Sequence, residues 1–570
     1  MSVIPVPDTA PLDLAVTSLR DGMDAWAGTG TAERIALLER LLPRIADGAP
    51  AMVGDAARAK GYEATSASAA EDWVAAPWAL AQTVSAYLHV LRRLSDGLDP
   101  VPARAVRERD GRTVVDVFPA TGADRLLLSG FTAQVWTLPG TTREEVLAKA
   151  AGAYRGRPGT PGVALVLGAG NVAAITPLDI LHKLYLDNQV VIAKMNPVNS
   201  YLRPHFEAVF AEFVDRGWVR FVDGGAAEGA YLTSHDGVDT IHVTGSERTH
   251  DAIVWGTDEQ AARRRRDDTP LNGKPFTSEL GGVSPCIVTP GPWSDADLRF
   301  QAEHIVTSKM NNSGHNCVAS QILVVPRDWD GTERLLDEIR GVLRRLPSRP
   351  DYYPGAAGRL RAVVDAHPGA EVLAGKANGV LVPDITGADD PMLTDEVFAS
   401  ALGVVRMEGK DPAEFLRRAT DFANETLPGT LGATLLVHPR TERAHRGAVN
   451  AAIAELRYGT LGVNCWSAFG FLLGYTPWGA FPGHTRRDIG SGIGFVHNAF
   501  MLEDVEKTVL RAPFAPSPRG LFAGSPSLSP RPPYFVTNRT GRTTMRRLTG
   551  FTAEPKLSKL PGILLSALRG

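Results

Sequence analysis

Residues 162–194 read GVALVLGAGNVAAITPLDILHKLYLDNQVVIAK, and this stretch decides the fold class. Two short apolar runs, 163–167 and 190–193, flank a helical stretch. Continuous apolar strands that alternate with helices are typical of a sheet that is buried on both faces. The sequence therefore predicts an α/β fold.

The alternation continues outward from this stretch in two series. Strands are expected at 219–222 and 241–243 in the first series, and at 286–288, 322–325, 380–382 and 433–437 in the second. We therefore predict two open α/β domains with a boundary near Glu279. The first domain comprises residues 15–111 and 150–279, and the second comprises residues 280–500.

Three further segments differ from these domains in composition or in hydrophobic pattern. Residues 112–142 are rich in β-branched and aromatic residues with turn formers, which predicts a β-hairpin in an arm at 112–149. Residues 511–570 form a tail rich in Pro, Ser and Arg, which favours an extended or partly disordered chain. Apolar residues at helical spacing within 38–45 and 84–91 predict helices that serve packing alone.

Composition excludes several classes of protein. The 570 residues carry 60 Lys and Arg against 63 Asp and Glu, a net charge of −3, which offers no field to gather nucleic acid. We expect a cytoplasmic protein, since neither a targeting peptide nor a transmembrane segment is indicated. The three cysteines lack Cys-x-x-Cys spacing, so we expect no disulfide framework and no metal site.

Three short segments are candidates for chemistry. Cys317 ends the loop NNSGHNC (311–317), Glu279 precedes a glycine pair, and the strand-to-helix turn Thr244-Gly245-Ser246 offers free amides to a phosphate. Each has a plainer interpretation, as a buried filler thiol, a surface carboxylate and a common turn. Whether the three segments form an active site therefore has to be judged from their combination.

Taken in order, these segments resemble the aldehyde dehydrogenase superfamily. The matching strings are Thr244-Gly245-Ser246, Glu279-Leu280-Gly281-Gly282 and Asn312-Ser313-Gly314-His315-Asn316-Cys317, with Glu396-Val397-Phe398 further on. Residues 168–171 also look like the Ala-Gly-Asn-Val stretch of long-chain acyl-CoA reductases. The resemblance implies an aldehyde dehydrogenase-like fold whose arm pairs with the sheet of a neighbouring subunit in a homodimer or homotetramer.

The resemblance also implies site residues. Cys317 would be the nucleophile, with a pKa lowered by local donors, Glu279 the general base, and Asn171 a donor to the oxyanion. The implied cofactor-binding residues are Lys194, Gly245, Ser246, Leu280, Glu396 and Phe398. Pro197 stands where NAD-specific relatives often have Glu, so the cofactor is NAD or NADP. His315 would either tune the thiol or merely solvate it.

The activity implied is NAD(P)-dependent oxidation of a small-molecule aldehyde to a carboxylic acid, through a cysteine thiohemiacetal and thioester. Glu279 favours hydrolysis of that thioester, because CoA-acylating branches commonly lack this residue. Two alternatives remain at this point: an acyl-CoA reductase or CoA-acylating aldehyde dehydrogenase, and a non-catalytic scaffold.

Overall fold

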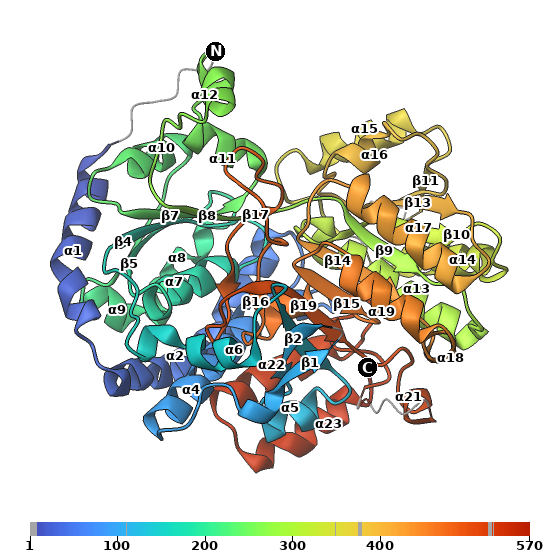
Figure 1. The fold of residues 1–570 in the computed structure, drawn as a ribbon, viewed down its shortest axis with the longest axis horizontal. Helices are drawn as coiled ribbons and strands as arrows, with labels where there is room; N and C mark the ends of the chain where they lie inside the picture. The colour runs from blue at the N-terminus through green and yellow to red at the C-terminus, as the bar shows by residue number, and fades with distance from the viewer. Residues whose placement is uncertain (1–7, 110, 348, 374–378, 523–526, 528) are drawn as a thin grey trace.

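The computed structural model describes residues 8–109, 111–347, 349–373, 379–522, 527 and 529–570 (Figure 1). Helices surround a six-stranded and an 11-stranded sheet, and a small two-stranded ribbon, β16 (Pro477–Trp478) with β18 (Val496–His497), lies between elements of both. The predicted α/β class is confirmed.

The six-stranded sheet has the order β17-β8-β7-β4-β5-β6, parallel except for the edge strand β17. Its strands are β4 (Val163–Leu167), β5 (Val190–Lys194), β6 (Val219–Val222), β7 (Thr240–Gly245), β8 (Phe276–Leu280) and β17 (Gly492–Ile493). Every residue of β4 and β5 is buried, which explains why their apolar runs are continuous. Helices α1 (Ala10–Ala27) and α7 (Ile175–Tyr185) both pack on these two strands.

The 11-stranded sheet has the order β1-β2-β3-β19-β15-β14-β9-β10-β13-β12-β11. Its strands are β1 (Val106–Arg109), β2 (Arg112–Phe118), β3 (Thr132–Thr137), β9 (Ser284–Val288), β10 (Ser320–Pro326), β11 (Glu371–Val372), β12 (Val380–Val382), β13 (Ala401–Met407), β14 (Gly432–Leu436), β15 (Thr460–Val463) and β19 (Val505–Arg511). From β19 to β12 neighbouring strands run parallel. The chain passes from the first sheet to the second between β8 and β9.

The remaining helices cover the sheets and the molecule's lower end in Figure 1. They are α2 (Thr31–Ala59), α3 (Ala69–Trp73), α4 (Ala79–Ser95), α5 (Gly122–Leu127), α6 (Arg143–Lys149), α8 (Arg203–Val209), α9 (Ala211–Asp215), α10 (Ala226–Ser234), α11 (Glu247–Val254), α12 (Ala261–Asp267), α13 (Asp295–Met310), α14 (Gly331–Arg345), α15 (Ala356–Ala366), α16 (Pro391–Thr394), α17 (Pro412–Glu425), α18 (Pro439–Ala444), α19 (Arg446–Glu455), α20 (Phe469–Leu472), α21 (Arg519–Phe522), α22 (Gly541–Ala553) and α23 (Leu560–Ala567). The two packing helices predicted near the N-terminus lie within α2 and α4. No helix of the described ranges is long and apolar enough to cross a membrane.

The arm lies against the sheet of its own chain. Strands β1, β2 and β3 form an antiparallel meander, with α5 inserted between β2 and β3, and β3 pairs with β19, which in turn pairs with β15. The expectation that the arm pairs with a neighbouring subunit is therefore wrong for this structure. The edge of β15 that a neighbour would cover is already paired within the chain. Assembly into a homodimer or homotetramer stays a prediction, and it requires another surface.

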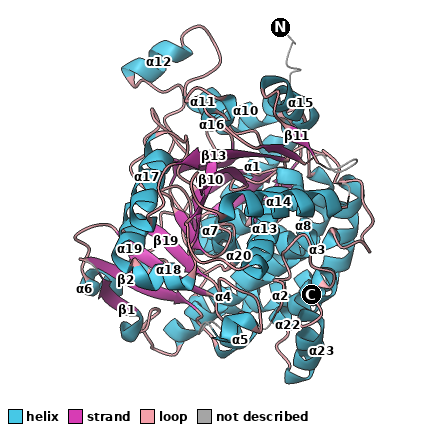
Figure 2. Ribbon diagram, turned by 90° about the vertical axis from the view of Figure 1, so that its right-hand side faces the viewer, coloured by secondary structure: helices cyan, strands magenta, loops and turns pink. Residues whose placement is uncertain are grey.

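The tail beyond residue 511 is folded in its described part. Helix α22 packs against α2, α3 and α4, and α23 packs on α22 (Figure 2). Phe535, Met545, Leu548 and Ile563 are buried there, and Arg531 forms an ion pair with Glu303 of α13 at 2.6 Å. The prediction of an extended tail is therefore wrong for the described residues, and residues 523–526 and 528 lie outside them. Apolar side chains spaced among the Pro, Ser and Arg residues supply the missing burial.

Replacing Phe535 tests whether the tail is part of the folded core. Its ring lies 5.3 Å from Phe300 and 5.6 Å from His304, both on α13. We expect Phe535→Ala to lower the free energy of unfolding by about 3 kcal/mol, the usual cost of such a cavity. Leu557→Ala, at a tail position that is 83% exposed, is the control and should change it by less than about 0.5 kcal/mol. Equal urea midpoints for both variants would contradict a packed tail.

An engineered disulfide tests the pairing of β15 with β19. Thr460 lies opposite Thr508 in the register, and strands about 4.8 Å apart suit a disulfide. We expect oxidised Thr460→Cys/Thr508→Cys protein to keep the mass of one chain on a non-reducing gel. Three thiols rather than five should then react after denaturation, because the native chain has three free cysteines. A band at twice the mass would mean that the strands pair between chains.

Candidate functional site

The carboxyl edge of the six-stranded sheet gathers most of the predicted site residues. Asn171 follows β4, Lys194 ends β5, Gly245 ends β7, and Glu279 and Leu280 end β8. Strands β7 and β8 pair so that Gly245 lies opposite Leu280. Ligands bind to open α/β sheets outside the carboxyl ends of the strands. This edge is therefore the candidate active site.

Cys317 reaches this edge from the other sheet. It follows the short turn η5 (Asn311–Gly314) and precedes β10. Cys286 and Cys465 are fully buried, whereas Cys317 keeps part of its surface exposed. Of the three thiols, the one in the predicted loop is thus the one that a small molecule can reach.

The Glu279 carboxyl lies near enough to the Cys317 thiol for its charge to raise the pKa of that thiol. Glu279 is 3% exposed, its Oε1 has no hydrogen-bond partner, and burial raises its pKa to about 7. Burial, then the charges of Glu279 and Glu396, raise the pKa of Cys317 well above that of a free thiol. The expectation that local donors lower the pKa of Cys317 is therefore wrong. The resting thiol keeps its proton, beside a carboxylate that can accept it.

Asn171 is tied to the cysteine loop. Its Nδ2 donates to the carbonyl of His315 at 3.0 Å, two residues before Cys317, and its own carbonyl accepts a hydrogen bond from Asn312 Nδ2 at 2.9 Å. A side-chain amide has two N–H donors, so one remains for a ligand. Asn171 is 8% exposed, and any charge that it stabilises is screened little by water.

Asn312 holds the loop in place, a role that the sequence reasoning missed. Its backbone has φ +54°, and its Oδ1 accepts from Lys60 Nζ at 2.8 Å and from Tyr352 at 3.0 Å. Its N–H donates to Glu71 at 2.6 Å, and Lys60 pairs with Asp72 at 2.7 Å. Lys60 and Glu71 belong to the N-terminal helical region and lie 252 and 241 positions away from Asn312, whereas Tyr352 lies 40 positions away. The Asn-x-Gly string marks the residue in sequence, but nothing there marks its partners.

Glu396 and Phe398 approach the site from the loop before β13. Burial raises the pKa of Glu396 to about 8, and its buried Oε1 has no hydrogen-bond partner. A Cβ at Gly281 would lie 2.3 Å from that oxygen, so any side chain there would displace the Glu396 carboxylate. Lys309 faces the same carboxylate, and its pKa falls to about 7 because it is buried.

His315 is fully buried rather than solvating the thiol. Its Nδ1 pairs with the carbonyl of Phe398 at 2.9 Å, and its ring lies against Tyr352, Tyr353 and Phe398. Burial lowers its pKa to about 4, so the ring is neutral near pH 7. Phe398 itself has φ +47°. Both residues shape the loop that carries Cys317.

The other predicted cofactor residues lie along the carboxyl edge of the six-stranded sheet. Lys194 Nζ donates to the carbonyls of Gly224 and Met195 at 2.7 and 3.1 Å. Ser246 is exposed and caps α11 by accepting from the N–H of Thr249. Leu280 is buried, and its N–H donates to the carbonyl of Ser491 at 2.8 Å.

An apolar pocket, partly open to solvent and with about 60 Å³ of space that a water molecule can enter, adjoins Cys317. Its walls come from several elements and include Val74, Val172, Ile175, Trp466, Phe469, Phe471, Leu472, Trp478 and Tyr534. The acidic residue in this lining, Glu71, is paired with Arg349 at 2.5 Å. Within the described ranges, no three His, Cys, Asp or Glu side chains cluster to hold a metal ion. The arrangement suits nucleophilic attack by Cys317 on an uncharged substrate.

Curated proteins with similar sequences are dehydrogenases. N-succinylglutamate 5-semialdehyde dehydrogenase 1 of Caulobacter vibrioides is 28% identical over 35% of this chain and 43% of its own length. D-glyceraldehyde dehydrogenase (NADP(+)) of Thermoplasma acidophilum is 25% identical over 44% of this chain and 50% of its own. The chain thus spans half or less of the length of these curated relatives.

Solved structures share the fold at low sequence identity. An NAD-dependent aldehyde dehydrogenase from Sinorhizobium meliloti matches with a TM-score of 0.58 and 18% identity, over 90% of this chain and 89% of that one. An NADP-dependent glyceraldehyde-3-phosphate dehydrogenase from Bacillus halodurans, complexed with NADP, matches with a TM-score of 0.55 and 18% identity, over 89% and 92%.

The sequence model of the aldehyde dehydrogenase family matches residues 161–473, more than half of the chain. This range includes Cys317, Glu279, Asn171 and every predicted cofactor residue. The chain therefore belongs to the aldehyde dehydrogenase family.

Proposed function

We propose that this chain oxidises an aldehyde to a carboxylic acid, with NAD or NADP as the hydride acceptor. The observation that carries the proposal is that a partly exposed thiol, Cys317, lines an apolar pocket and lies near a buried carboxyl, Glu279, that can accept its proton. Family membership supports the same chemistry. The similarity of residues 168–171 to acyl-CoA reductases finds no support among the relatives described above, and that activity becomes an outcome of the test.

The residues along the sheet edge fit a dinucleotide. The unpartnered Oε1 of Glu396 suits the ribose hydroxyls, and the exposed N-terminus of α11 at Ser246 suits the pyrophosphate. Lys194 would lie near the adenosine ribose. Residue 197 is Pro, so no carboxylate stands there to repel a 2′-phosphate. The similar proteins include NAD- and NADP-dependent enzymes. We therefore propose that either dinucleotide can bind. When bound, the nicotinamide supplies the acceptor for the hydride.

The protein's own groups carry the remaining steps. Glu279 takes the proton of Cys317, and the sulfur then bonds to the carbonyl carbon of the aldehyde. The Asn171 side chain and the Cys317 N–H stabilise the oxyanion, each by about 3 kcal/mol. Loss of hydride from the thiohemiacetal leaves a thioester. Glu279 releases its first proton to solvent and then deprotonates a water that attacks the thioester carbon. The C–S bond breaks to release the acid, and Glu279 returns a proton to the Cys317 thiolate.

Substitution of the two central residues tests the proposal. We expect Cys317→Ala to abolish NAD(P)H formation from aldehydes, because no other group can form the thiohemiacetal. Glu279→Gln should slow turnover by about 10²- to 10⁴-fold, the usual worth of a general base. Initial rates at 340 nm, with and without CoA, measure both effects.

Cys286→Ala serves as the matched control, since this buried thiol lies in β9 outside the site. It should keep the native rate. Full activity of Cys317→Ala would overturn the proposal. An acyl-CoA product formed strictly with added CoA, and unaffected by Glu279→Gln, would indicate the acyl-CoA activity instead. Failure to bind either dinucleotide would indicate a scaffold.

The pH dependence of turnover follows from the raised pKa of Glu279. Below about pH 7 this carboxyl is protonated in the folded protein and accepts no proton, so the rate should rise as pH increases. A single ionisation near 7 predicts a rise of about tenfold in kcat between pH 6 and pH 8. Glu279→Gln should remove that limb of the profile. A flat native profile over this range would argue against Glu279 as the base.

A further inference from the structure

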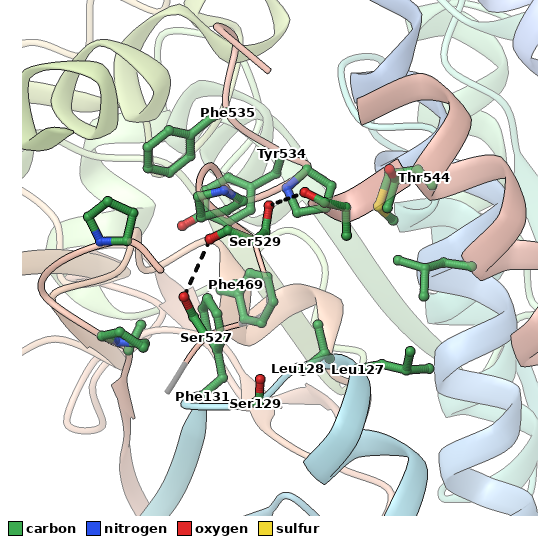
Figure 3. Close-up of a pocket in the computed structure, with 18 of the residues that line it drawn as sticks. Leu127, Leu128, Ser129, Phe131, Phe469, Ser527, Ser529, Tyr534, Phe535 and Thr544 are labelled. Atoms are coloured by element: carbon green, nitrogen blue, oxygen red, sulfur yellow. Dashed lines mark hydrogen bonds between the residues drawn. The ribbon is translucent and has the colours of Figure 1, made fainter. Parts of the chain in front are cut away.

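A second apolar cavity lies between the arm segment, α20 and the tail (Figure 3). The space within it that a water molecule can enter is about 80 Å³, and the cavity is partly open to solvent. The arm contributes Leu127, Leu128 and Phe131, and the tail contributes Phe535, Met545, Leu548, Ile563 and Ala567. The folded tail thus builds one wall of a hollow, in addition to covering the core.

This distal cavity adjoins the pocket at Cys317. Val74, Phe469 and Tyr534 line both. The Phe469 ring stacks on Phe131 at 4.7 Å and lies 5.6 Å from Tyr534. The two hollows therefore adjoin along these apolar and aromatic side chains, with the thiol at one hollow and the tail at the other.

The lining of the distal cavity excludes a charged ligand. Among its described residues none is Asp, Glu, Lys or Arg, and burial keeps His304 neutral. Ser529 Oγ already bonds the carbonyl of Ala567 at 3.0 Å, and the unpartnered hydroxyls of Ser129 and Thr544 are neutral. A charged group buried there would lack a partner and be strongly disfavoured. An alkyl chain, in contrast, needs no polar partner.

We propose that the substrate is a long-chain, unbranched aliphatic aldehyde. Its carbonyl lies at Cys317, and its alkyl chain passes Phe469 and Tyr534 into the distal cavity. This inference rests on the proposed aldehyde oxidation and adds the substrate class. It also assigns the tail a part in the substrate site, since Tyr534 and Phe535 belong to the tail.

The chain-length dependence of kcat/KM tests the inference. Each buried methylene is worth about 0.8 kcal/mol, or about fourfold. For the native protein we expect kcat/KM to rise at least about 100-fold from propanal to decanal. If neither aldehyde is oxidised, the proposed function fails. If propanal is oxidised and decanal is no better, the proposed function stands and the long-chain inference is overturned.

A variant that fills the distal cavity localises the effect. Ala567→Trp places a large ring in the cavity and should lower the decanal-to-propanal ratio of kcat/KM at least about tenfold. Leu565→Trp is the matched control, because Leu565 lies on the same helix and is 52% exposed. It should keep the native ratio. An unchanged ratio in Ala567→Trp would overturn the placement of the chain.

Inhibition of the native protein provides a measurement that does not depend on how a variant folds. We expect 1-decanol to compete with propanal at least about 30-fold more strongly than 1-butanol, since six more methylenes would be buried. Equal inhibition by the two alcohols would overturn the inference even if Ala567→Trp fails to fold.

Discussion

The hydrogen bonds around Asn312 are the constraint on which the site depends. Asn312 has a left-handed backbone conformation. Its side chain accepts hydrogen bonds from Lys60 and Tyr352 and donates to the main-chain carbonyls of Asn171 and His315. These partners come from the N-terminal helical region, the first sheet and the second. Because an unpaired buried amide is costly, these bonds fix the cysteine loop relative to both sheets. The position of Cys317 over Glu279 follows from that.

The two ends of the site differ in their exposure to solvent. Near Cys317 burial raises the pKa of the thiol and of Glu279, so the pair holds a proton that can move between them. Along the sheet edge, Ser246 stays exposed and keeps the helix N-terminus open to a ligand. A buried reaction centre thus adjoins an exposed binding edge, and both lie at the carboxyl edge of the six-stranded sheet.

The sequence predicts local features well and distant contacts poorly. Buried parallel strands such as 163–167 are continuous apolar runs, and Glu279 and Cys317 stand in short strings, so both could be predicted. The partner of β19 could not be predicted, because the sequence of a strand does not show whether its neighbour belongs to the same chain. The folded tail could not be predicted from its overall composition, because a few apolar side chains, such as Phe535, hold it against the core and hardly change that composition. The direction in which the pKa of Cys317 shifts depends on burial, and the sequence of a loop does not show how deeply the loop is buried.

The pairing of β19 with β15 in the same chain has a thermodynamic consequence. A sheet that is completed by a neighbour's strand loses that strand on dilution, since the association is bimolecular. Here the arm reaches its place by closing a loop, and the cost of that closure is set by chain length rather than by protein concentration. The second sheet, and the cysteine loop beside it, can therefore form in an isolated molecule.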